Sequence, residues 1–163
     1  MKLSRKAKRY DDSVQPGDFH DFEAFREGDL EREGLLVGSI RRASQGVEIA
    51  HLSLERQPTR KQSFAKLRSK AERLTQEVTY LCERLEIVDH DRRGMYIQLR
   101  SLPPYKDDHQ IQFNEISIAR DKVILKRVAF YRKDEVKRQV PLSMTEEELK
   151  RLLADLRSVF GTA

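Results

Sequence analysis

The clearest hydrophobic pattern in the chain runs through residues 61–85. Its apolar positions are spaced alternately three and four residues apart, at Phe64, Leu67, Ala71, Leu74, Val78, Leu81 and Leu85. This heptad spacing puts them on one side of a helix, and no Gly or Pro interrupts the run. We therefore predict a long helix over about 62–85, which either lies across a sheet or pairs with another helix in the manner of a coiled coil.

Beyond residue 85 the hydrophobic period changes from that of a helix to that of a strand. Met95, Ile97 and Leu99 alternate with polar residues, which is typical of a half-buried strand. The connectors are short turns, such as the one at residues 91–94, and short connectors favour antiparallel pairing of consecutive strands. The pattern predicts an antiparallel meander of four or five strands over about 86–142.

The C-terminal segment has a complete helix-start signal. Thr145 and Glu148 have the spacing of a capping box, and a wide apolar stripe follows as far as Phe160. We predict a helix over about 146–160. Residues 61–163 are then expected to form an α+β domain made of a long helix, the antiparallel meander and the C-terminal helix.

Residues 1–60 are patterned more weakly, and we expect a flexible or weakly structured charged N-terminal arm. Within it Phe19, Phe22 and Phe25 recur at every third residue, which favours a short helix from Asp18 to about Glu27 with three rings on one side. Such a stripe either docks on a partner or packs on the protein's own core. Residues 35–37 and 47–49 favour two short strands.

Charge is arranged in blocks along the chain of 163 residues, and the net charge of +5 is a small difference between them. Residues 1–9 hold five Lys/Arg and no acid, whereas residues 11–33 hold nine Asp/Glu. Residues 56–73 then carry seven Lys/Arg against Glu72 alone. The blocks fit either a solvated surface or an acidic leader that competes with an anionic ligand for a basic surface.

Signals for chemistry are scarce. The single cysteine, Cys82, excludes an internal disulfide framework, and no glycine-rich phosphate loop is present. The four histidines do not have the spacing of a metal site. The turns at residues 89–91 and 107–109 each place a His beside two Asp, which could hold a metal but is far more common in an ordinary polar turn, so we expect no metal and no cofactor. We expect no catalytic residues, although an enzyme whose site is assembled from distant residues stays an alternative.

Targeting signals are also scarce. No apolar run approaches the length of a membrane span, and no apolar stretch follows the basic start as it would in a secretory signal. We therefore expect a cytoplasmic protein with no membrane span.

These observations favour a non-catalytic macromolecule-binding protein that uses the heptad-patterned helix and the charged arm. The partner would be another protein or a second copy of the chain, and a dimer would form through the helix. The candidate partner-binding residues are Phe19, Phe22, Phe25, Leu67, Leu74 and Leu81.

The alternative ligand is a nucleic-acid backbone, bound by the basic segments and by one face of the sheet. Tyr96 and Arg100 point to the same side of their strand, and Arg127 and Tyr131 share that side if the strands align suitably. Tyrosines that stack bases beside arginines that hold phosphates are typical of sheet-type RNA binders.

Overall fold

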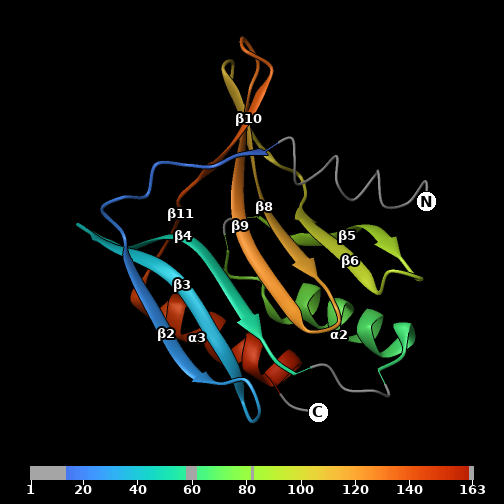
Figure 1. The fold of residues 1–163 in the computed structure, drawn as a ribbon. Coiled ribbons are helices and arrows are strands. Elements are labelled where there is room, and N and C mark those ends of the chain that lie inside the picture. Colours follow the sequence, from blue (N-terminus) through green and yellow to red (C-terminus); the bar gives the residue numbers. More distant parts are fainter. Residues whose placement is uncertain (1–13, 58–61, 82, 162–163) are drawn as a thin grey trace.

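A computed structural model of the chain describes residues 14–57, 62–81 and 83–161. Within them the strands join one sheet, whose continuous path runs β2-β3-β4-β9-β8-β6-β5 (Figure 1). The strands are β1 (Val14–Gln15), β2 (Glu23–Asp29), β3 (Gly34–Ala43), β4 (Gly46–Glu55), β5 (Leu85–Asp91), β6 (Tyr96–Ser101), β7 (Tyr105–Lys106), β8 (Gln110–Ile118), β9 (Lys122–Tyr131), β10 (Val136–Val140) and β11 (Leu142–Met144). The helical elements are α2 (Phe64–Glu77), α3 (Glu146–Leu156) and a π-helical turn, η1 (Arg157–Gly161).

The core lies between one face of this sheet and the helices. Residues that pair directly across neighbouring strands share a face. One cross-strand row runs through Leu52, Leu125, Ile116 and Leu99, and all four side chains are at most 1% exposed. The apolar sides of α2 and α3 join the same cluster. The helices are therefore held by burial of their apolar stripes against a continuous apolar sheet face.

The predicted α+β fold class is wrong, because the described chain is mostly β and forms a sheet of 11 strands. The segment expected to be a weakly structured arm supplies β1–β4, and β4 pairs with β9 inside the sheet. The alternating signal is weak there because β4 is buried on both faces, at Ala50 and Ser53 as well as at Leu52 and Leu54. Residues 1–13 and 58–61 of the expected arm lie outside the described residues.

The helix expected over 62–85 is also shorter than the pattern predicted. α2 ends at Glu77, and the chain enters β5 at Leu85. Leu81 and Leu85 are nevertheless 4% and 1% exposed, so the heptad spacing reports burial beyond the end of the helix. Residues of modest helix propensity, Val78, Thr79 and Tyr80, stand where the helix stops. The described residues hold no coiled-coil-like helix, and that prediction is wrong.

The C-terminal helix begins where the sequence predicted. The Thr145 hydroxyl accepts a hydrogen bond from the Glu148 amide at 3.0 Å, and the Glu148 carboxylate accepts one from the Thr145 amide at 3.2 Å. This reciprocal pair is the capping box read from the sequence. Among the described helices none is long and apolar enough to span a membrane.

The ends of the sheet differ in character. The β5–β6 and β8–β9 turns lie together at one end, because Ile97 pairs with Ile118. The β9–β10 hairpin extends from the opposite end, where Tyr131 pairs with Gln110 and Val136 (Figure 1). Surface residues on these two sets of turns are therefore well separated.

Candidate functional site

The structure separates the three phenylalanines of the predicted docking stripe. Phe19 and Phe22 form an edge-to-face pair with ring centroids 5.1 Å apart, and the Arg41 guanidinium lies 4.7 Å from the Phe22 centroid. Phe25 stands on β2, not on a helix, and packs against the core. The predicted helix over residues 18–27 is absent, since β2 begins at Glu23.

The three leucines proposed to bind a partner lie in the protein's own core. Leu67 and Leu74 are 0% exposed and Leu81 is 4% exposed. They pack in the cluster between the sheet and the helices. These side chains present no surface for a second helix unless the fold opens.

The four residues of the predicted nucleic-acid face lie on two different faces of the sheet. Arg100 pairs with Glu115, whereas Arg127 pairs with Asn114, the neighbouring residue on β8. Consecutive residues of a strand point to opposite faces, so Arg100 and Arg127 are on opposite sides. Tyr96 shares the parity of Arg100, and Tyr131 that of Arg127. This register depends on strand pairing and was not readable from the alternation alone.

Arg127 is instead the centre of a buried polar network. Its side chain is 10% exposed, and its Nη1 lies 3.2 Å from Glu83 Oε1. The same nitrogen donates to Asn114 Oδ1 at 2.7 Å, and Nε donates to Gln112 Oε1 at 2.9 Å. Ser101 Oγ donates to the Glu83 carboxylate at 3.3 Å. The network fastens the connection after α2 to the sheet.

Arg100 and Tyr96 also have partners within the protein. Arg100 Nη2 lies 3.3 Å from Glu115 Oε2, and its guanidinium stacks 4.4 Å from the Phe113 ring centroid. The Tyr96 hydroxyl donates to Ser117 Oγ at 3.3 Å. Both side chains therefore make structural contacts on the sheet.

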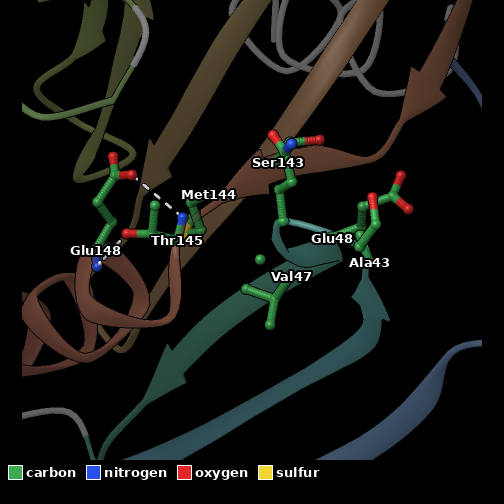
Figure 2. A pocket seen from close by; sticks show the side chains of 10 residues that line it. Ala43, Val47, Glu48, Ser143, Met144, Thr145 and Glu148 are labelled. Carbon is green, nitrogen blue, oxygen red and sulfur yellow. Dashed lines mark hydrogen bonds between the residues drawn. The ribbon is translucent and has the colours of Figure 1, made fainter.

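A hollow of about 350 Å³ lies between the β3–β4 turn, β11 and the start of α3 (Figure 2). The start of α3 faces this hollow, and a helix N-terminus favours anions. Figure 2 shows the Glu148 side chain bonded to the Thr145 backbone within the hollow. Glu146, which also stands in the first turn, pairs with Arg42 at 2.7 Å. The protein's own carboxylates already compensate this helix end, which disfavours a bound anion.

A different surface combines several cations that have no acidic partner among the described residues. We call it the cationic corner, and it comprises Lys66, Lys70, Arg92, Arg93 and Arg120. None of these five side chains forms an ion pair with a described residue. The corner extends along the N-terminal half of α2, beside the β5–β6 and β8–β9 turns.

Ring contacts tie the corner to the start of α2. The Arg92 guanidinium lies 5.5 Å from the Phe64 ring centroid, and the His90 ring centroid lies 5.7 Å from the same ring. Arg120 and the β5–β6 turn residues Gly94 and Met95 line one shallow hollow, which places the two turns side by side.

The start of α2 adds a partial positive charge to the corner. The hydroxyl of Ser63 caps the helix by accepting from the Lys66 amide at 3.2 Å, and the first turn contains no acid. Burial lowers the pKa of Lys70, and the nearby charges of Arg56 and Lys66 lower it further. An anion bound near Lys70 would relieve this repulsion.

The turns of the corner also carry acids. Asp91 accepts a hydrogen bond from the Gly94 amide at 3.1 Å, and Asp89 accepts one from the His90 amide at 2.8 Å. Asp121 follows Arg120 in the β8–β9 turn. The five cations outnumber these three carboxylates, so the corner keeps an excess of positive charge.

The sequence indicated only part of the cationic corner. The block of cations at 56–73 marked the helix, but Arg92 and Arg93 read only as turn residues, and nothing local connected them with Lys66.

The described residues contain no group of three His, Cys, Asp or Glu side chains placed to hold a metal ion. No family model matches this chain, and no curated protein or solved structure matches it either.

Proposed function

We propose that this is a macromolecule-binding protein and that the cationic corner binds the phosphate backbone of a nucleic acid. The observation that carries the proposal is the gathering of five cations without carboxylate partners among the described residues. Clustered Lys and Arg bind phosphates regardless of base sequence, because each neutralised phosphate releases condensed counterions.

The arrangement suits a backbone better than a small anion. Lys66 and Lys70 are one helical turn apart, and Arg92 and Arg93 stand on a neighbouring turn, so the charges spread over a surface instead of converging in a cavity. The exposed His90 ring beside Phe64 supplies an aromatic surface next to the cations. Phosphate contacts from such a surface fix position and do not read base sequence.

The size of the corner sets the expected affinity. Contacts limited to five cations correspond to sequence-independent binding, for which a Kd of about 10⁻⁴ to 10⁻⁶ M at physiological salt is typical. We therefore expect binding that is readily measured at low ionic strength and that weakens steeply as salt is added.

The proposal is tested by fluorescence anisotropy with labelled RNA and DNA oligonucleotides of mixed sequence at low salt. We expect the R92A/R93A double variant to bind about tenfold more weakly than the wild type, because two phosphate contacts are lost. No measurable binding by the wild type would refute the proposal.

A matched control separates the corner from net charge. Arg132 and Lys133 are also adjacent, exposed cations in a hairpin turn, but they stand at the opposite end of the sheet. The R132A/K133A variant removes the same charge and should bind within about twofold of the wild type. Equal losses in the two variants would contradict a site at the corner.

A further inference from the structure

The second surface of interest is the free edge of β2, which is the outermost strand at one end of the sheet path. Among the described strands β2 pairs only with β3 (Figure 1). The pairing runs without a register shift from Glu23, opposite Ile40, to Asp29, opposite Gly34. One side of a seven-residue strand therefore has no described strand beside its main-chain donors and acceptors. The Glu27 carbonyl also accepts a hydrogen bond from Arg157 Nη2 at 3.3 Å.

The other edges of the sheet carry features that hinder strand addition. β5, at the far end of the path, has a bulge between Ile87 and Asp89. β1 and β7 are two residues long, and β11 is three residues long. Bulges, short length and charged side chains are the usual protections of a sheet edge, and of these β2 has only the charged side chains.

The side chains of β2 indicate the chemistry of a strand that would fit there. Glu23, Phe25 and Glu27 have the same parity and lie on the face that carries the helices, since Phe25 packs on the core and Glu27 reaches Arg157 of η1 at 3.2 Å. The Glu27 side chain is still 61% exposed, and Glu23 makes no ion pair with a described residue. This face of the edge is acidic around one apolar ring.

We propose that the edge of β2 binds an extended segment of a partner protein in which Lys or Arg alternates with apolar residues. Opposite charges across neighbouring strands stabilise a pair, and the alternate side chains of an added strand would stand beside Glu23, Phe25 and Glu27. Two β2 strands from two copies of this chain would instead place carboxylates beside carboxylates, which is destabilising. Charge complementarity therefore selects a basic segment over a second copy of β2.

This site is separate from the cationic corner, because β2 and β5 are the two ends of the sheet path and the corner adjoins β5. Loss of one binding activity leaves the other intact. An experiment that refutes one proposal therefore leaves the other unaffected.

The test uses a synthetic peptide in which lysine alternates with valine, titrated calorimetrically into the full-length protein. We expect binding, and we expect the E23K/E27K variant to bind about tenfold more weakly because favourable cross-strand pairs become repulsive. The control E86K/D89K makes the same charge change on β5, where Glu86 and Asp89 are exposed, and should leave the affinity unchanged. Failure of the wild type to bind, or equal binding by E23K/E27K, overturns the proposal.

Main-chain pairing is tested with the wild-type protein alone. The same peptide methylated on its backbone nitrogens keeps every side chain but loses its amide donors, so it should no longer bind. Hydrogen exchange should show new protection at the amides of β2 and none at those of β5 when the unmethylated peptide is added. Equal affinity for the methylated peptide would show charge attraction without strand addition and would overturn the proposal.

Discussion

Replacing Arg127 by Met should lower the free energy of unfolding much more than a substitution on the surface does. The Arg127 side chain is 10% exposed and that of Glu83 is 14% exposed, so both charges are largely removed from water. Methionine keeps much of the volume but removes three contacts, to Glu83, Asn114 and Gln112. Among the described residues, the Glu83 carboxylate then retains only the Ser101 hydroxyl as a side-chain donor.

The expected magnitude follows from that environment. Breaking a buried ion pair by removing one partner costs about 3–5 kcal/mol, and the residual exposure of Glu83 argues for the lower end, about 3 kcal/mol. For a chain of this size this corresponds to a fall in Tm of about 10 °C. Urea denaturation followed by far-UV circular dichroism measures the loss in free energy of unfolding.

A second variant distinguishes charge burial from lost packing. The E83L/R127M double variant removes both charges, so it should recover more than about 1 kcal/mol of the loss, although Asn114 and Gln112 remain without their donor. A loss below about 1 kcal/mol for R127M alone would place the pair among solvent-exposed salt bridges and would refute the reasoning. R127M should also bind nucleic acid with the affinity of the wild type, because Arg127 is buried and paired with Glu83 and is not a free cation on the surface.

The remaining expectations concern stability. L74A should lower the free energy of unfolding by about 2–5 kcal/mol in urea denaturation, because Leu74 is 0% exposed, and a loss under 1 kcal/mol would contradict its place in the core. T145A should cost about 1 kcal/mol through loss of the helix cap, whereas T79A, at an exposed position outside any helix, should be near neutral. Burial, and then the charge of Lys122, lowers the pKa of His51, so its contribution to stability is complete above about pH 6.5 and is lost as the pH falls below that value. If the free energy of unfolding of H51Q falls between pH 7 and pH 5 by as much as that of the wild type, His51 is not responsible for the pH dependence.

The sequence predicted individual elements better than it predicted their assembly. The start of α3 was readable because a capping box is a local signal formed by Thr145 and Glu148. The strands around residues 35–37 and 47–49 exist within β3 and β4, joined by a tight turn at Ser44 and Gln45. Neither signal indicates which strands become neighbours, and the pairing of β4 with β9 joins residues separated by about seventy positions in the chain.

The heptad pattern misled for a physical reason. Spacing of apolar residues reports which side chains are buried, and Leu81 and Leu85 are buried without being helical. Similarly, the alternation of Tyr96 and Arg100 was read correctly within one strand, but the face shared with Arg127 depended on register. A shift of one residue between β8 and β9 reverses that assignment. The cationic corner could not be predicted from the sequence, because its residues come from three separate segments of the chain.

The most direct test of nucleic-acid binding at the cationic corner is the salt dependence of its affinity. The Kd of the wild type for duplex DNA should rise with salt. The logarithm of the binding constant should fall linearly with the logarithm of salt concentration, with a slope of about −3.6 to −4.5 for four or five phosphate contacts. The slope for R92A/R93A should be shallower by about 1.8, and the slope for R132A/K133A should equal that of the wild type. A wild-type slope near zero, or the same slope in all three proteins, would contradict binding of phosphates at the corner.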